Sequence, residues 1–269
     1  MIPCDINPLR QEMKRGKKVS AAWLHGASNI TAEIMGKAGM DVVVIDMEHG
    51  PGDILTLISQ IQGMQGYPTV PFVRSAWNDF VQIKRILDAG AYGLFIPYVN
   101  TKEEAEAVVN AVSYPSQSMK TGIRGMATSH RAAHFAMDPK RGYLHHANDQ
   151  ISVFLQIETP KGLSNLDEIL TVERVDGIVI GPMDLATNMG FFADPSAREV
   201  QEAIAVIEKK TLAAGKMLAT IASDWDDAAA KYRRGYSLVL TLSDTVTLGK
   251  VTKNYVDLFT GEFGGKNKQ

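Results

Sequence analysis

The sequence predicts an α/β fold, a TIM-type (β/α)8 barrel that forms one domain over residues 1–269. Strand-like and helix-like segments alternate eight times along the chain, and about 250 residues is the usual size of such a barrel. Several strand-like runs are continuously apolar, as expected for parallel strands covered on both faces. The competing doubly wound sheet requires a glycine-rich phosphate loop after its first strand. The chain has Gly26-Ala27-Ser28-Asn29 there instead.

The expected strands are short apolar segments, each followed by a helix-forming segment. They span residues 20–25, 41–48, 69–74, 93–98, 153–158, 177–182, 217–222 and 237–242. The pairs Thr159-Pro160 and Asp194-Pro195 each predict a helix that begins with an N-cap and a proline in its first turn. Gly90 stands where the helix after the third strand should end.

The connection at about residues 114–152 is far longer than the usual few residues between a helix and a strand. We expect this insertion to form a wall or lid over the C-terminal face of the barrel, where the active sites of such barrels lie. The alternative is a surface excursion with its own short helix at 141–150. We assign no role to its four histidines, His130, His134, His145 and His146.

The composition limits the classes of partner. The chain has 28 Lys and Arg against 30 Asp and Glu, so it predicts no nucleic-acid partner. Cys4 is the only cysteine, which excludes an intrachain disulfide or a thiolate metal site and predicts a reducing cytoplasm. No segment resembles a signal peptide or approaches the roughly 18–20 apolar residues of a membrane span, so we expect no membrane partner.

Four polar residues stand directly after apolar runs, at the ends of expected strands. They are His49, Arg74, Glu158 and Asp184. Because all strand C-termini of a parallel barrel open onto one face, these side chains should meet there. Two carboxylates, an arginine and a histidine at one mouth predict an active site.

Glu158 and Asp184 lie one βα unit apart and should stand on adjacent strands. Two close carboxylates repel unless they share a proton or bind a cation. Without cysteine or paired histidine ligands, an oxygen-preferring divalent ion is indicated, Mg²⁺ or Mn²⁺, with Ca²⁺ as a further candidate. The alternative is that both residues cap the helices that follow. This alternative is weak for Glu158 and applies mainly to Asp184, because acidic residues favour the start of a helix.

Three further positions suit the chemistry of a 2-keto acid. Arg74 is suited to stabilise the negative charge of an enolate oxygen. His49 follows Asp46 and Glu48, so a carboxylate should tune its charge for acid–base work. Asp88 ends a helix, where an acid opposes the helix dipole, and we interpret it as a residue placed to act in another subunit.

At this point the chain resembles the HpcH/HpaI family of class II, metal-dependent pyruvate aldolases, which includes 4-hydroxy-2-oxoheptanedioate and 2-keto-3-deoxyglucarate aldolases. The resemblance runs from about Trp23 to beyond Gly249. It is carried by six motifs in order, Val44-Ile45-Asp46-Met47-Glu48-His49, Val73-Arg74-Ser75-Ala76-Trp77-Asn78-Asp79, residues 82–90, Gly122-Ile123-Arg124-Gly125, Gln156-Ile157-Glu158-Thr159 and Ile180-Gly181-Pro182-Met183-Asp184-Leu185.

The resemblance implies a role for each matching position. Glu158 and Asp184 would bind the metal, Arg74 the pyruvyl oxygen, and the Met183 and Asp184 amides the pyruvate carboxylate. His49 would transfer protons, paired with Asp88 of a neighbouring subunit. Gln156 and Trp23 would line the pocket. The resemblance also implies a homohexamer in which a C-terminal helix is exchanged between subunits.

These features predict an aldehyde-lyase. It would cleave a 4-hydroxy-2-oxo acid reversibly to pyruvate and an aldehyde through a metal-stabilised pyruvate enolate. No lysine stands at a strand end facing the mouth, where an imine-forming aldolase requires one. Two alternatives remain. One is a decarboxylase or other lyase or ligase that acts on a 2-keto acid such as oxaloacetate, on a related phosphoenolpyruvate/pyruvate-type barrel. The other is a non-catalytic barrel that binds a 2-keto acid.

Overall fold

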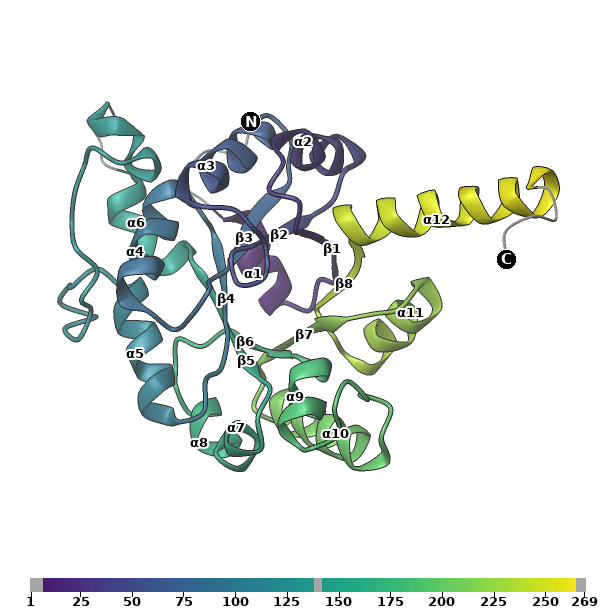
Figure 1. Ribbon diagram of the computed structural model, residues 1–269. Helices are drawn as coiled ribbons and strands as arrows, with labels where there is room; N and C mark the ends of the chain where they lie inside the picture. Colours follow the sequence, from purple (N-terminus) through teal and green to yellow (C-terminus); the bar gives the residue numbers. More distant parts are fainter. Residues whose placement is uncertain (1–6, 138–141, 265–269) are drawn as a thin grey trace.

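A computed structural model describes residues 7–137 and 142–264. In this part of the chain, parallel strands close into a barrel in the order in which they occur in the sequence (Figure 1). They are β1 (Val19–Leu24), β2 (Val42–Asp46), β3 (Val70–Arg74), β4 (Gly93–Ile96), β5 (Ser152–Ile157), β6 (Gly177–Ile180), β7 (Met217–Ile221) and β8 (Leu238–Ser243). The predicted (β/α)8 barrel is confirmed.

Helices surround the barrel, as Figure 1 shows. They are α1 (Pro8–Lys14), α2 (Asn29–Ala38), α3 (Ile54–Gly63), α4 (Phe80–Ala89), α5 (Lys102–Val112), the 3₁₀ segment η1 (Arg131–Ala136), α6 (Gly142–Gln150), α7 (Pro160–Ser164), α8 (Leu166–Leu170), α9 (Pro182–Asn188), α10 (Arg198–Ala213), α11 (Trp225–Arg234) and α12 (Asp244–Phe263). No helix of the described ranges is long and apolar enough to cross a membrane.

The strands are apolar on both faces because each face is covered. In β2, Val42 and Val44 belong to the cluster of side chains inside the barrel, whereas Val43 and Ile45 pack toward the helices. Successive side chains of a strand point to opposite faces, so every second residue of a strand enters the interior. This alternation decides which residues at the strand ends can face the barrel mouth.

Helix α1 closes the N-terminal end of the barrel. The Asn7 amide donates to the Tyr92 carbonyl at 3.1 Å, just before β4. Arg10 donates to both carboxylate oxygens of the buried Asp176, at 3.0 and 2.9 Å, just before β6. Side chains from α1 therefore bind the starts of the strands, and the opposite end is left for a functional cavity.

The insertion lies at the closed end of the barrel, so the expectation that it covers the C-terminal face is wrong. It leaves α5 and enters β5, and both of these termini lie at the N-terminal end because helices run antiparallel to the strands they follow. Its alternative description, an excursion with a short helix of its own, is correct for α6. Asn148 of α6 ties it to the start of the insertion through two hydrogen bonds with the backbone of Tyr114.

Two of the expected helix signals are confirmed and one is wrong. Thr159 caps α7 by accepting from the Gly162 N–H, and Gly90 ends α4 with a left-handed φ of 108°. Asp194 does not begin a helix. Its carboxylate accepts from the Ser196 N–H at 3.0 Å in a local turn, and α10 starts only at Arg198. An aspartate side chain closes such a turn as readily as it caps a helix.

Helix α12 leaves the barrel and projects away from it (Figure 1). It has no buried residue along its 20 positions, although the chain gives it many large apolar side chains. Those at least 48% exposed are Val246, Leu248, Val251, Tyr255, Val256, Leu258, Phe259 and Phe263. Exposed apolar side chains at this density are typical of an interaction surface.

We expect Phe72→Ala to lower the free energy of unfolding by about 3–5 kcal/mol, because it opens a cavity inside the barrel. Phe72 is fully buried, and its ring centroid lies 6.2 Å from those of Phe95 and Phe154. Urea denaturation followed by circular dichroism measures the change. The matched control is Phe192→Ala, since Phe192 is 84% exposed and its loss should change stability by less than about 0.5 kcal/mol. Equal effects of the two variants would contradict the packing described above.

Candidate active site

Polar residues replace apolar ones where the inward-facing positions reach the C-terminal end of the barrel. In β2 the interior residue Val44 is followed two positions later by Asp46. In β3 and β5 the same alternation leads to Arg74 and to Gln156, with Glu158 two residues further on. The strand alternation therefore directs these side chains into one space at the mouth.

That space is a cavity of about 490 Å³. Of the predicted site residues, all but Asp88 line it, namely Trp23, His49, Arg74, Gln156, Glu158, Met183 and Asp184. They come from β1, β3, β5 and the segments that follow β2, β5 and β6. The structure thus brings together residues that are up to 161 positions apart in the sequence, from 23 to 184.

Arg74 and Asp46 form a buried, two-pronged ion pair. The Arg74 Nε donates to Asp46 Oδ1 at 2.8 Å and its Nη2 donates to Oδ2 at 2.7 Å. Burial by itself raises the pKa of the Asp46 carboxyl, but the hydrogen bonds from His25 and Arg74 outweigh it and hold that pKa well below its usual range. Asp46 is therefore ionised at neutral pH and fixes the plane of the guanidinium.

Two further groups hold the guanidinium in place. Its Nη1 lies 3.0 Å from Glu48 Oε2, and its Cζ lies 4.5 Å from the centre of the Trp23 ring. A guanidinium has five N–H groups, and the two hydrogen bonds to Asp46 leave three of them for Glu48 and the cavity. Arg74 can therefore donate to a substrate oxygen without leaving its carboxylate partner.

Glu158 is a buried carboxylate of a different kind. It accepts from the Tyr98 N–H at 2.7 Å and from the Gln156 amide at 2.9 Å. The pKa of its carboxyl is raised to about 7. Burial raises it most, the hydrogen bond from Tyr98 lowers it, and the charges of Glu48 and Asp184 raise it. Gly181 lies so close that a Cβ there would stand 2.7 Å from Glu158 Oε2. A side chain at position 181 would therefore displace the Glu158 carboxylate.

Asp184 lies in the first turn of α9 and is half-buried, beside the exposed Met183. It raises the pKa of Glu158, so the two negative charges interact across the cavity. His49 is exposed and lies in the lining just after β2. Of the two carboxylates expected to tune His49, Asp46 is bound to Arg74 and His25. Glu48 does interact with His49: burial raises the pKa of the Glu48 carboxyl, and the charges of Arg74 and His49 lower it.

Glu158 and Asp184 fit the chemistry of a divalent ion. Both are oxygen donors, and burial together with the charge of Asp184 disfavours the ionised form of Glu158, which a cation between the two carboxylates would favour. In the described residues no group of three or more His, Cys, Asp or Glu side chains is arranged to hold a metal. A pair of protein ligands leaves coordination positions open for substrate oxygens.

Asp88 does not share this cavity. It lies at the C-terminal end of α4, at the closed end of the barrel, and its Oδ1 accepts from Arg124 Nη2 at 2.9 Å. His130 Nε2 lies 3.5 Å from the same oxygen. The fully buried Arg124 compensates the carboxylate, so the unfavourable place of Asp88 at the end of a helix is offset within its own subunit. Within the described residues its Oδ2 makes no hydrogen bond.

Three residues that the sequence interpretation did not select belong to the site. Asp46 binds Arg74, and Glu48 and His25 lie beside this pair. His25 stands at the end of the first expected strand, as the four selected residues stand at the ends of theirs, so the same rule would have found it. The lining also includes Lys250, which comes from α12 rather than from a strand, and no strand-end rule could have found it.

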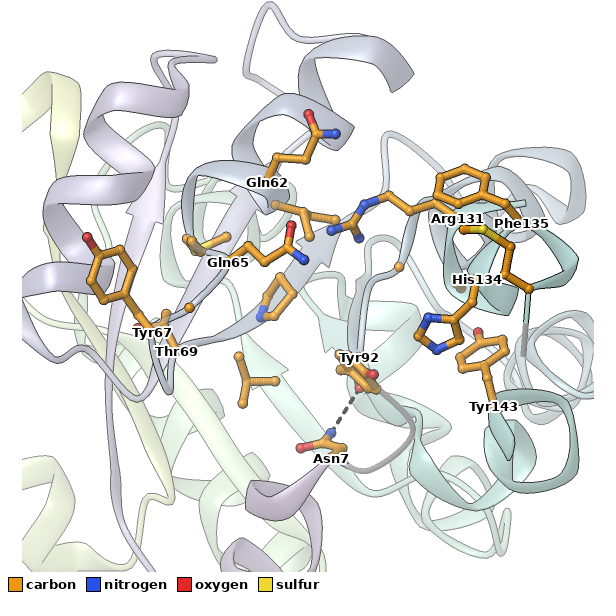
Figure 2. A pocket seen from close by; sticks show the side chains of 18 residues that line it. Asn7, Gln62, Gln65, Tyr67, Thr69, Tyr92, Arg131, His134, Phe135 and Tyr143 are labelled. Atoms are coloured by element: carbon orange, nitrogen blue, oxygen red, sulfur yellow. Dashed lines mark hydrogen bonds between the residues drawn. The ribbon is translucent and has the colours of Figure 1, made fainter. Parts of the chain in front are cut away.

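A second cavity, of about 310 Å³, lies between the insertion and the starts of β3 and β4. Figure 2 shows His134, Phe135 and Tyr143 of the insertion on one side of it and Gln65, Tyr67 and Thr69 on the other. Its described lining contains no Asp or Glu. It therefore does not compete with the first cavity as the place of the predicted chemistry.

Comparisons with known proteins show the family of the chain. The sequence model of the HpcH/HpaI aldolase/citrate lyase family matches residues 20–248. A 4-hydroxy-2-oxo-heptane-1,7-dioate aldolase of Salmonella dublin is 42% identical over 211 residues, which cover 78% of either chain. A HpcH/HpaI aldolase/citrate lyase family protein from Burkholderia cenocepacia has a TM-score of 0.88 at 33% identity, covering 93% of this chain and 98% of its own. A HpcH/HpaI aldolase from Desulfitobacterium hafniense has a TM-score of 0.87 at 25% identity, covering 97% and 99%.

We expect Asp46→Asn to lower the free energy of unfolding at pH 7 by about 3 kcal/mol, because it leaves Arg74 without its main counter-charge. The pKa of Asp46 is depressed in the folded state. The contribution of Asp46 is therefore present above the unfolded pKa of about 4 and is lost as the pH falls through the folded pKa. Urea denaturation of both proteins between pH 7 and pH 3 should show the difference shrinking only in acid.

The control for this experiment is Asp167→Asn. Asp167 forms an ion pair with Lys210 at 2.8 Å, but its side chain is 72% exposed, and a surface pair contributes at most about 1 kcal/mol. A cost for Asp46→Asn no greater than this control would show that the buried pair does not stabilise the barrel.

Proposed function

Since the chain belongs to the HpcH/HpaI aldolase/citrate lyase family and is an aldolase, we propose that it cleaves a 4-hydroxy-2-oxo acid reversibly to pyruvate and an aldehyde. The observation that carries this proposal is that Arg74 shares one cavity with the carboxylates of Glu158 and Asp184. An arginine fixed by Asp46 can stabilise an enolate oxygen while the opposite wall of the cavity binds the rest of the keto acid.

We propose that Glu158 and Asp184 hold a divalent cation, Mg²⁺ or Mn²⁺. Bound there, the ion would polarise the keto group of the substrate and offset negative charge that develops on its oxygen. Neighbouring residues of the chain orient the proposed ligands. The Gln156 amide and the Tyr98 N–H orient the Glu158 carboxylate, and their hydrogen bonds favour its charged form.

In the cleavage direction a base removes the proton of the 4-hydroxyl group, the C3–C4 bond breaks, and the aldehyde leaves. The bonding electrons remain on the pyruvate part as an enolate, which a proton on C3 converts to pyruvate. Arg74 donates hydrogen bonds to the enolate oxygen, and His49 at the cavity wall is the residue we propose for proton transfer. The role of the Met183 and Asp184 amides in binding the carboxylate stays a prediction.

Product formation from a set of substrates tests the function. We expect the protein to release pyruvate from 4-hydroxy-2-oxo acids, to lose this activity with a chelator, and to recover it with Mn²⁺ or Mg²⁺. Glu158→Gln should abolish Mn²⁺ binding in isothermal titration calorimetry and lower kcat at least about a hundredfold. Glu168→Gln is the matched control, because Glu168 is exposed on α8.

Three outcomes would contradict the proposal. Unchanged Mn²⁺ affinity in Glu158→Gln would place the metal elsewhere. A pyruvyl adduct trapped on a lysine by borohydride would indicate an imine mechanism, for which Lys250 of the lining is the candidate. Carbon dioxide release from oxaloacetate, without cleavage of any 4-hydroxy-2-oxo acid, would favour the decarboxylase alternative.

We further propose that the protein acts as a homohexamer in which α12 is exchanged between subunits. The support is the exposed apolar surface of α12, which has no buried residue in the barrel of the same chain. The same assembly would bring Asp88 to His49 of a neighbour. The two lie at opposite ends of their own barrel, and the Oδ2 of Asp88 is left for another partner. The cytoplasmic location and the single-domain organisation with an insertion at 114–152 stay predictions from the sequence.

A mixture of His49→Ala and Asp88→Ala proteins should recover activity that neither has alone. When subunits exchange, some sites combine an intact His49 from one chain with an intact Asp88 from another. Pyruvate release after refolding the two proteins together measures the effect. The control mixture is His49→Ala with Arg74→Ala, because both residues belong to the same chain's site and no mixed site is intact. An inactive first mixture, with hybrid oligomers present on native gels, would show that Asp88 does not act across subunits.

A further inference from the structure

The histidine at the end of β1 takes part in the active site without being one of the predicted site residues. The interior positions of β1 run through Val19, Ala21 and Trp23, and His25 continues this alternation two residues on. Its side chain is 25% exposed and lines the cavity. The strand geometry therefore points His25 at the barrel mouth.

The His25 ring is fixed on three sides. Its Nε2 lies 3.2 Å from Asp46 Oδ2, its Nδ1 lies 2.9 Å from Ser243 Oγ, and its plane packs on Trp23 with 5.3 Å between ring centres. An ionised carboxylate can only accept, so Nε2 carries the proton. In the neutral ring, Nδ1 is then the acceptor for the Ser243 hydroxyl.

Two residues at the N-terminal end of α12, Ser243 and Asp244, also contact His25, and we call them the root of α12. Ser243 is the N-cap of this helix, and the carboxylate of Asp244 accepts from the backbone N–H groups of His25 and Gly26 at 2.9 and 3.1 Å. The same carboxylate accepts from the Thr31 hydroxyl at 2.9 Å. The first residues of the projecting helix are thus bound to the end of β1 by side chain and backbone together.

Asp46 connects His25 to Arg74. Its side chain has no exposed surface, and Oδ2 receives both the His25 Nε2 and the Arg74 Nη2. A continuous series of polar contacts therefore runs from Ser243 through His25 and Asp46 to the guanidinium. Each member has its remaining freedom restricted by packing or by a second hydrogen bond.

We propose that His25 is a positioning residue that couples the root of α12 to Arg74 through Asp46. It keeps the carboxylate in the plane in which both of its oxygens bind the guanidinium, and so keeps the free N–H groups of Arg74 directed at the substrate oxygen. This inference rests on the proposed function for the role of Arg74. It adds a link between the catalytic arginine and the helix that we propose to be exchanged between subunits.

The test compares His25→Ala with His25→Gln in the full-length protein loaded with Mn²⁺. The readout is exchange of the pyruvate methyl protons with D2O, followed by NMR, which reports enolate formation without any aldehyde. We expect His25→Ala to lower kcat for exchange roughly ten- to a hundredfold, the scale of one lost hydrogen bond to a charged group. KM for pyruvate should stay within about twofold, since Arg74 itself is kept. His25→Gln should recover most of the rate, because its amide can donate to Asp46.

Ser243→Ala tests the link to α12. It should lower kcat in the same direction by a smaller factor, because His25 keeps Asp46 and loses one of its constraints. Thr101→Ala is the matched control, since Thr101 caps α5 through the Glu104 N–H in the same way and lies outside the network. Equal rates of Ser243→Ala and Thr101→Ala would refute the coupling to α12.

A readout without turnover separates this inference from the proposed function. In ¹⁵N-histidine spectra we expect the His25 ring to be protonated on Nε2, and Ser243→Ala to shift its Nδ1 signal while Thr101→Ala does not. Full activity of His25→Ala, or a His25→Gln rate no higher than that of His25→Ala, would overturn the positioning role. Failure of the wild-type protein to exchange pyruvate protons, with the His25 signals as expected, would instead count against the proposed function.

Discussion

The buried ion pair between Arg74 and Asp46 is the interaction on which the arrangement of the barrel mouth depends. A charge placed in a protein interior is costly unless an opposite charge and hydrogen bonds compensate it, and each member of this pair has such partners. Arg74 also contacts Glu48 and Trp23, and Asp46 also contacts His25. The guanidinium is therefore held before any substrate arrives, so its orientation does not have to be established during the reaction.

The carboxylates of the mouth differ because their surroundings differ. Asp46 faces a guanidinium and has a depressed pKa, whereas Glu158 faces other carboxylates and has its pKa raised to about 7. The first is committed to holding Arg74. The second has two neutral hydrogen-bond donors and no salt bridge among the described residues, although its charge also acts on Arg74. This difference separates the arginine from the carboxylates that we propose as metal ligands, and the cavity that they line has room for a small keto acid.

The topology of the barrel places residues at strand ends and residues at helix ends on opposite sides of the barrel. Segments that follow strands reach the open end, and segments that follow helices reach the closed end, where α1 binds the strand starts. Asp88 lies in the last turn of α4, and Arg124 and His130 lie in the insertion after α5, so they meet each other there and do not reach the cavity of their own chain. A role for Asp88 in catalysis therefore requires a second copy of the protein. The exposed apolar surface of α12 gives an independent reason to propose one.

The sequence by itself determined the barrel and most of the site. Apolar runs set the strands, and the position of Arg74, Glu158 and Asp184 directly after such runs was enough to bring them to one mouth, because strand direction fixes which end each residue reaches. Only the tertiary structure decided the pairing. Asp46 stands three residues before His49 in the sequence, yet it binds Arg74 from the next strand and His25 from the strand before. Likewise the compensation of Asp88 by Arg124, 36 residues away, and the place of the insertion at the closed end depend on how helices return along the barrel. Side-chain partners across strands are set by register and packing in three dimensions, and a linear pattern of residue types does not contain them.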